Sequence, residues 1–298
     1  MRPIVVIKGG LGNQLFQWAY AHTLYLHSGQ NFYPSRFHYG YHDKIKYLEL
    51  GDIFESCPHV FRKGSISPTK EYLSHLAEWT WNKQSGRVLA ETLLRYYQED
   101  PRNDQKQNYK KSANTWISSG YFQNNFYVDN SPSVVELEIM PHTEKIATRL
   151  IEAKVIPRKY SVLHIRTGDY SKQSARDKNF IGNLHDRYFL DNLDKLDASY
   201  LIVLTENASH IPKLLNKIKP DLVLDIAQLN AWETLATMAF SESLIGANSS
   251  LSWWGAKLAS LRGANAWLPE NWSSWNNINS IDYRFRNLRT LESIWRSS

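Results

Sequence analysis

The sequence is poor in cysteine and in long apolar runs. Its 298 residues include one cysteine, Cys57, which excludes an internal disulfide framework and a cysteine-rich zinc site. No stretch approaches the roughly 20 apolar residues of a membrane-spanning helix, and the apolar run at residues 4–7 is too short for a signal peptide. We therefore expect a cytoplasmic protein, and a peripheral contact with the inner face of a membrane stays open.

Basic residues are numerous but do not form a compact cluster. The formal net charge is +6 at pH 7, which favours an anionic partner such as a nucleotide diphosphate, a nucleic acid or an acidic membrane surface. Because Lys and Arg are spread along the chain, a nucleic acid is disfavoured, and we expect none as a partner.

Several catalytic motifs are also missing. The chain has no HExxH zinc motif, no Asp-x-Asp pair at a strand end and no GxSxG elbow of a serine hydrolase, and its ten histidines are scattered. We expect no metal ion and no cofactor. A diphosphate bound by this chain would then be neutralised by arginine and by helix N-termini.

The first part of the chain begins like a nucleotide-binding unit. Residues 4–7 form a β-branched run that ends in two glycines, and a helix pattern follows over residues 14–27, as in the opening of a Rossmann-like fold. The alternation is then lost up to residue 157. We expect this stretch to complete a helix-rich domain, with helices at residues 70–81 and 88–99.

Beyond residue 157 the pattern is more regular. Strands alternate with helices, which predicts an α/β fold with a doubly wound parallel sheet. The chain should therefore have two domains, residues 1–157 and 158–298. The expected strands are 161–165, 200–204, 222–224, 243–247 and 264–268, and the expected helices are 186–196, 210–218, 231–240 and 251–261.

Glycines and polar residues that can contact a ligand follow three of the expected strands. Ligands of parallel sheets lie at the carboxyl ends of the strands, so these positions form the candidate site. They are Gly10, Gly12, Asn13 and Gln14 after the first strand, Arg166 and Asp169 after the strand that ends at residue 165, and Asn248, Ser249 and Ser250 after the strand that ends at residue 247.

Each of these segments has a structural and a chemical interpretation. The glycine turn lets a backbone approach a ligand, but it matches neither GxGxxG nor a P-loop and also fits a plain turn. Arg166 suits a diphosphate and the charge that grows on a leaving phosphate, or it forms a surface pair with Asp169. Ser249 and Ser250 fit helix N-caps, and a capped helix N-terminus also holds phosphate.

Taken together, three segments resemble the bacterial α-1,2-fucosyltransferases of glycosyltransferase family 11. They are GGLGNQLFQWA at residues 9–19, HIRTGDY at 164–170 and GANSSLSWWGAKL at 246–258, in the family's order. The resemblance extends to GDP-fucose enzymes that share an H-x-R-R-x-D motif. It implies a GT-B-like architecture, in which two Rossmann-like domains face a cleft. Residues 1–157 would then be the acceptor-side domain, and residues 158–298 would bind the GDP-sugar.

The resemblance also implies roles for single residues. Arg166 would contact the donor diphosphate. Apart from the resemblance, an inverting transfer makes Asp169, and behind it Glu206, a candidate base for the acceptor proton. Asp169 could equally orient Arg166 or cap a turn, and a weak base or none could suffice because the diphosphate is a good leaving group. Thr167 replaces the family's second arginine, and Thr205-Glu206-Asn207 replaces a Ser-Asp-Asp segment of many relatives. The donor-binding residues implied are Gly10, Gly12, Asn13, Gln14, His164, Glu206, Asn248, Ser249 and Ser250.

The expected activity is an inverting, metal-independent transfer of L-fucose from GDP-fucose. The acceptor would be a hydroxyl, with O-2 of a β-galactoside implied by the resemblance, on an oligosaccharide or a lipid-linked glycan of O-antigen or surface polysaccharide synthesis. Two alternatives stay open. One is a related inverting transferase that uses another nucleotide sugar, and the other is a non-catalytic sugar-binding protein, in view of the 11 Trp and 17 Tyr.

Overall fold

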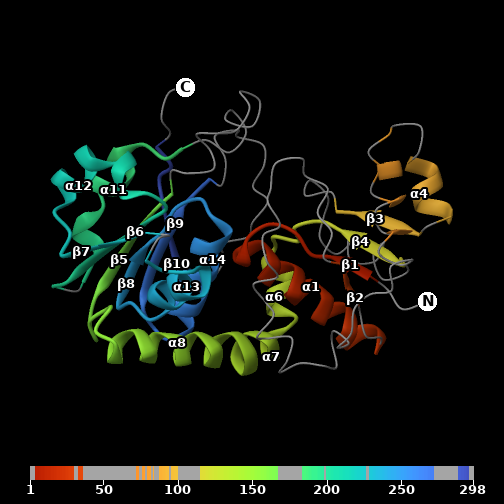
Figure 1. Cartoon of the computed structure of the whole chain (residues 1–298), viewed down its shortest axis with the longest axis horizontal. Helices are drawn as coiled ribbons and strands as arrows, with labels where there is room; N and C mark the ends of the chain where they lie inside the picture. Colours follow the sequence, from red (N-terminus) through yellow and green to blue (C-terminus); the bar gives the residue numbers. More distant parts are fainter. Residues whose placement is uncertain are drawn as a thin grey trace. The chain divides into compact units, whose positions relative to one another are not determined.

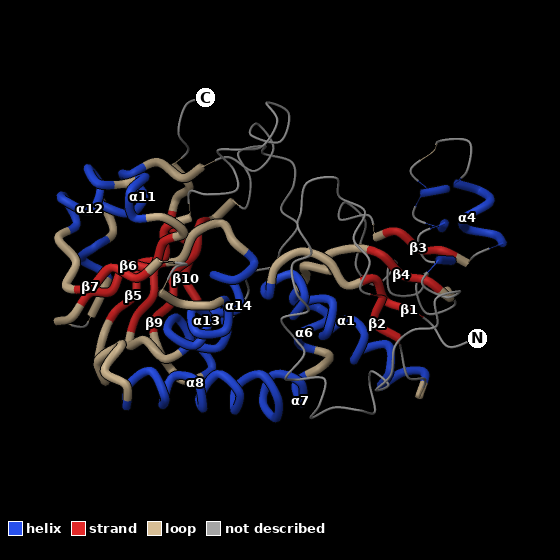
Figure 2. The backbone as a smooth tube through the Cα atoms, viewed as in Figure 1, coloured by secondary structure: helices blue, strands red, loops and turns tan. Residues whose placement is uncertain are grey.

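Two compact α/β units, Met1–Ile139 and Met140–Ser298, make up the chain. Each unit is built on a parallel sheet with helices (Figures 1 and 2), which confirms the expected fold class. The computed structural model describes residues 4–29, 33–35, 72–73, 76–77, 79–81, 83, 87–93, 95–99, 115–166, 183–197, 199–225, 228–271 and 288–294.

The first unit has a four-stranded parallel sheet in the order β2-β1-β4-β3. In the register, Ile4 pairs with Tyr33 of β2 on one side and with Ile117 of β4 on the other. All four strands are short, and the sequence predicted only the first. The strands are β1 (Ile4–Val6), β2 (Tyr33–Ser35), β3 (Tyr96–Gln98) and β4 (Ile117–Ser119).

The predicted helix at residues 88–99 is only half right. Helix α4 (Arg87–Leu93) ends early, and Tyr96 and Tyr97 of β3 are buried and pair with β4. Aromatic residues favour a pleated, half-buried surface, and here pairing with a neighbouring strand outweighs the helical pattern. Strand β3 therefore replaces the second half of the expected helix.

Helix α1 (Leu11–Ser28) begins three residues before the predicted start. Gly10 is its N-cap, and at its other end Gly29 adopts φ 65° while its N–H donates to the carbonyl of Tyr25. Most of the helix is buried, and it packs against α6 (Asn125–Asp129). The glycine turn therefore starts the helix directly, with its first turn at the carboxyl end of β1.

Helix α8 (Met140–Glu152) begins the second unit, where it lies beside α13 (Ala231–Ala239), as Figure 1 shows. It follows α7 (Pro132–Val134) and the π-helix η2 (Val135–Ile139). The unit boundary precedes α8, whereas the predicted division at residue 157 falls after it, because the apolar face of α8 packs within the second unit.

The second unit confirms the doubly wound parallel sheet. Its strand order is β10-β9-β8-β5-β6-β7, and all neighbours pair in parallel. Counted from β5, this is the order 3-2-1-4-5-6 of dinucleotide-binding sheets. The sequence did not predict β10. The strands are β5 (Ser161–Ile165), β6 (Leu201–Thr205), β7 (Leu222–Leu224), β8 (Ser243–Ile245), β9 (Asn265–Pro269) and β10 (Leu288–Leu291).

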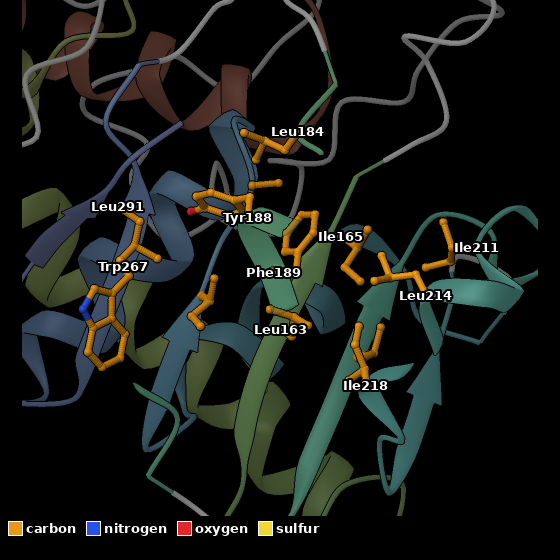
Figure 3. Close-up of a cluster of buried hydrophobic side chains, with 13 residues drawn as sticks. Leu163, Ile165, Leu184, Tyr188, Phe189, Ile211, Leu214, Ile218, Trp267 and Leu291 are labelled. Atoms are coloured by element: carbon orange, nitrogen blue, oxygen red, sulfur yellow. The ribbon is translucent and has the colours of Figure 1, made fainter. Parts of the chain in front are cut away.

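Helices pack on both faces of this sheet. Helix α14 (Ser250–Leu261) contacts β8 and β9, and α13 contacts β5. On the other face, side chains of α11 (Asp186–Leu190) and α12 (Pro212–Ile218) join a buried apolar cluster, which Figure 3 shows. Because side chains alternate along a strand, Leu163 and Ile165 face this cluster while His164 faces α14.

Candidate functional site

The candidate site lies where the strand order of the second sheet reverses. The chain passes from β5 to β6 on one side and later returns to place β8 on the other side of β5. In open α/β sheets, ligands bind outside the carboxyl ends of the strands at this reversal. Arg166 directly follows β5, and residues 246–250 follow β8, so two of the predicted segments flank this point.

Arg166 is held on two sides. Its Nη1 donates a hydrogen bond of 2.9 Å to Ser249 Oγ, and its Nε lies 3.2 Å from Glu206 Oε1. The side chains of Arg166 and Glu206 are 22% and 21% exposed, so the pair is partly shielded from water but still reachable by a ligand. A guanidinium fixed in this way is preorganised to bind a phosphate oxygen with its charge intact.

Ser249 occupies the N-cap position of α14, as predicted, but it does not cap the helix with its side chain. Its Oγ accepts from Arg166 instead, while its carbonyl accepts the first helical hydrogen bond, from the N–H of Trp253 at 2.9 Å. Ser250 is the first residue of the helix, and Asn248 and Ser249 are buried just before it. The first N–H groups of a helix have no acceptor within the helix, so this end attracts an anion.

His164 connects β5 to the first turn of α14. Its Nδ1 lies 2.5 Å from Ser252 Oγ, and this oxygen accepts a hydrogen bond of 3.1 Å from the N–H of Ala247. Burial, together with the charge of Arg166, lowers the pKa of His164 from 6.5 to about 3. The imidazole is therefore neutral at neutral pH, and the Ser252 hydroxyl can donate to Nδ1. His164 thus holds the loop between β8 and α14 against β5.

Two further residues shape this loop, and sequence reasoning missed both of them together with Ser252. The hydroxyl of Tyr188, on α11, donates to the carbonyl of Gly246 at 3.0 Å. A Cβ on Gly246 would lie 2.6 Å from Leu268 Cδ2 and 3.0 Å from Ser252 Cβ, so a side chain there would force Leu268 and Ser252 to shift.

The glycine turn of the first unit lies at the carboxyl end of β1, as predicted. Gly9 has φ 79°, and Gly10 precedes α1, whose first turn contains Gly12, Asn13 and Gln14. Gln14 is buried and donates to the carbonyl of Gly9 at 2.9 Å, so it stabilises the turn itself. Asn13 Oδ1 accepts from Gln123 Nε2 at 2.6 Å.

The structure therefore brings together His164, Arg166, Glu206, Asn248, Ser249 and Ser250 at one edge of the second sheet. Asp169 and Thr167 lie outside the described residues, and the role of Asp169 stays a prediction. The sequence also predicts that the glycine turn and this edge of the second sheet face the same cleft, and this stays a prediction.

Among the described residues, no group of three or more His, Cys, Asp or Glu side chains is arranged to hold a metal ion. Within the same part of the chain, no helix is both long and apolar enough to cross a membrane. Three tryptophans, Trp18, Trp253 and Trp254, are fully buried and belong to the cores of the two units. Their rings are therefore unavailable as sugar-binding surfaces.

The model of glycosyl transferase family 11 matches residues 82–280, more than half of the chain. No curated protein matches the sequence. Among solved structures, the chain is similar to an arginine-to-lysine mutant of Arabidopsis thaliana FUT1 in complex with GDP, at 11% identity and a TM-score of 0.44, over 93% of this chain and 73% of that one.

Two other solved structures are similar to this chain at about the same low sequence identity. One is the glycosyl transferase family 9 protein from Veillonella parvula DSM 2008, at 12% identity and a TM-score of 0.49, over 100% of this chain and 88% of that one. The other is POFUT1 in complex with GDP-fucose, at 11% identity and a TM-score of 0.40, over 86% and 94%. These likenesses are too distant to carry an argument about activity.

Proposed function

Because this chain belongs to glycosyl transferase family 11, we propose that it transfers L-fucose from GDP-fucose to a hydroxyl of a glycan acceptor. The observation that carries the proposal is the placement of Arg166. It lies at the reversal point of the second sheet, fixed between Glu206 and Ser249, beside the N-terminus of α14. These are the groups that an enzyme needs around a nucleotide diphosphate.

The chemistry is a single displacement at the anomeric carbon of fucose. The acceptor oxygen forms a bond to this carbon as the bond to the diphosphate oxygen breaks, and configuration inverts. The acceptor proton passes to a carboxylate or to water, and GDP leaves with the electron pair. The transition state resembles an oxocarbenium ion, as in glycoside hydrolysis, and negative charge grows on the diphosphate. Arg166 and the first N–H groups of α14 stabilise that charge without a metal ion.

Glu206 serves Arg166 in this mechanism. Its carboxylate lies 3.2 Å from Nε of the guanidinium, and Ser249 Oγ accepts a hydrogen bond from Nη1, so Glu206 and Ser249 together orient the guanidinium for the diphosphate. Asp169, in the HIRTGDY segment, is the better candidate for the base that accepts the proton from the acceptor.

The acceptor we propose is O-2 of a β-galactoside, on an oligosaccharide or on a lipid-linked glycan of surface polysaccharide or O-antigen synthesis. The three segments that resemble α-1,2-fucosyltransferases support the linkage. The net charge of +6 suits a lipid-linked acceptor at an anionic membrane surface, with the protein in peripheral contact.

The test is incubation of the protein with GDP-fucose and a panel of β-galactosides, followed by linkage analysis of the product. An α-1,2-linked fucose that forms in the presence of EDTA is the expected result. A parallel panel of GDP-mannose and UDP-galactose tests the use of another nucleotide sugar, and transfer from one of these in place of GDP-fucose would overturn the donor assignment.

Calorimetry with GDP separates the enzyme from a non-catalytic sugar-binding protein. The site around Arg166 should bind GDP. A protein that binds glycans but shows no heat with GDP would be a lectin-like protein, and the transferase proposal would fail.

A further inference from the structure

The first sheet has a reversal point of its own. In the order β2-β1-β4-β3, the chain moves from β1 to β2 on one side, while β4 lies on the other side of β1 (Figure 1). The segments after β1 and β4 are residues 7–10 and 120–123. The rule that places ligands at the reversal of a parallel sheet therefore singles out these two segments.

Lys8 and Tyr121 lie on either side of this point. Lys8 Nζ donates a hydrogen bond of 2.9 Å to Ser119 Oγ, the last residue of β4, and lies 5.4 Å from the centre of the Tyr121 ring. Tyr121 is 42% exposed, although the residues around it are largely buried. An ammonium group and a partly exposed aromatic ring thus stand together at the edge of the sheet.

A buried glutamine fixes the two segments to each other. Gln17 of α1 has no exposed surface, accepts from the backbone N–H of Lys8 at 3.0 Å and donates to the carbonyl of Gly120 at 2.9 Å. One side chain therefore fixes the backbone of Lys8 relative to that of Gly120. Lys8 and the neighbouring Tyr121 are thus preorganised relative to each other.

The backbone after Tyr121 is strained. Phe122 has φ 50°, which is rare for a bulky residue, and such strain gathers at functional sites. Its ring is fully buried and stacks on the Tyr20 ring, with the two ring centres 3.6 Å apart. The backbone N–H of Phe122 donates a hydrogen bond of 2.6 Å to Glu99 Oε2. This conformation keeps the Phe122 ring in the core while the Tyr121 ring stays at the surface.

We propose that Lys8 and Tyr121 form a platform that binds the acceptor sugar. This inference rests on the proposed function and assigns residues that bind its acceptor. The Tyr121 ring offers an apolar surface to the C–H face of a sugar, while its hydroxyl and the Lys8 ammonium bond to sugar hydroxyls. The Asn13 and Gln123 amides, joined at 2.6 Å, add neutral polar groups on the same edge.

The charge of this edge favours a neutral sugar over a diphosphate. Among the described residues directly after β1, β3 and β4, Lys8 is the only one with a positive charge. The carboxylate of Glu99 lies on the same edge of the sheet. A diphosphate is held by several charge-assisted hydrogen bonds, which the second unit supplies through Arg166 and α14. An uncharged polyol needs only the amide, hydroxyl and ammonium groups found here.

The experiment compares Tyr121→Ala with Tyr25→Ala. Tyr25 lies in the same unit, near the C-terminal end of α1, and serves as the matched control. Saturation-transfer NMR with the β-galactoside lactose in the presence of GDP measures acceptor binding without turnover, and steady-state kinetics with GDP-fucose give the KM for lactose. We expect Tyr121→Ala to raise this KM about tenfold and to weaken the saturation signal, with GDP affinity by calorimetry unchanged.

Two further variants test the same platform. Tyr121→Trp keeps an aromatic surface and should retain lactose binding, and Lys8→Met should raise the KM for lactose while leaving GDP affinity at the parent level. The platform is overturned if Tyr121→Ala behaves like Tyr25→Ala, or if it weakens GDP binding and not lactose binding. A parent protein that binds GDP but no lactose also overturns it. A parent protein that binds no GDP contradicts the proposed function instead.

Discussion

Arg166 Nη1 donates a hydrogen bond of 2.9 Å to Ser249 Oγ, across the point where the strand order of the second sheet reverses. The two residues are 83 positions apart in the sequence, and they meet because β5 and β8 are neighbours in the sheet. Ser249 is thereby diverted from capping its own helix to orienting the guanidinium. This contact organises the donor site that we propose, and the following expectations start from it.

Replacement of Arg166 should abolish most of the transfer activity. Arg166→Ala removes a preorganised charge from the leaving diphosphate, and we expect turnover with GDP-fucose to fall on the order of 10²-fold or more. Arg166→Lys should recover only a small part, because an ammonium lacks the planar fork that meets both Ser249 and a phosphate. Arg187→Ala is the control, since this arginine is 70% exposed in a pair with Asp191. Near-normal turnover of Arg166→Ala with an intact fold would refute the assignment.

Ser249→Ala should affect activity but not stability. Because the side chain makes no cap hydrogen bond, its removal should not incur the roughly 1 kcal/mol that loss of an N-cap usually costs. Loss of one hydrogen bond to a charged group should lower turnover about tenfold.

Asn230→Ala is the matched control for Ser249→Ala. Asn230 caps α13 through a complete capping box with Glu233, so we expect it to lose about 1 kcal/mol in urea unfolding and to keep the parent turnover. If Ser249→Ala were the less stable of the two, its Oγ would be a structural cap after all.

Glu206→Gln should lower turnover without changing its pH dependence. The amide keeps a polar group near Arg166 Nε but removes the carboxylate charge, so the guanidinium is held less firmly. A residue that orients Arg166 does not accept the proton of the acceptor, and the acidic limb of the pH-rate profile should therefore stay at the parent position. Loss of that limb in Glu206→Gln would make Glu206 the general base.

Acid should destabilise the protein through His164. Its pKa is about 3 in the folded protein and 6.5 ordinarily, so between these values the unfolded chain binds a proton that the folded chain excludes. Stability then falls as the pH drops below about 6.5, by up to about 1.4 kcal/mol per pH unit.

His164→Asn separates this effect from other titrations. The amide can still bond to Ser252 Oγ but cannot be protonated, so its free energy of unfolding should fall less steeply with acid than that of the parent. Urea unfolding of both proteins at several pH values between about 7.5 and 4.5 provides the comparison. Parallel curves would show that His164 does not contribute to the pH dependence.

Much of the second unit could be predicted from its sequence. The strand expected at residues 161–165 is β5, and the helix expected at 251–261 begins only one residue earlier as α14. These elements are long or fully buried, so their hydrophobic period is clear. The first unit was harder, because β3 and β4 lack a run of β-branched or aliphatic residues such as marks β1 and β7, and they are stabilised by pairing with each other.

The sequence predicted some residues of the candidate site but none of the contacts between them. Arg166 and Ser249 were both identified from their places after strands, yet no local pattern indicates that they bond to each other. Tyr188, Ser252, Lys8 and Tyr121 were missed because each acts through a partner far away in the chain.

The sequence by itself determined where β1 and most strands of the second unit lie, which residues follow them and which family the chain resembles, since these depend on local pattern and motif. Only the tertiary structure decided which strand ends are neighbours. Sheet order depends on which buried faces pack together and on pairing between distant strands. That order brings Ser249 to Arg166 and Tyr121 to Lys8, and so decides which residues can act together.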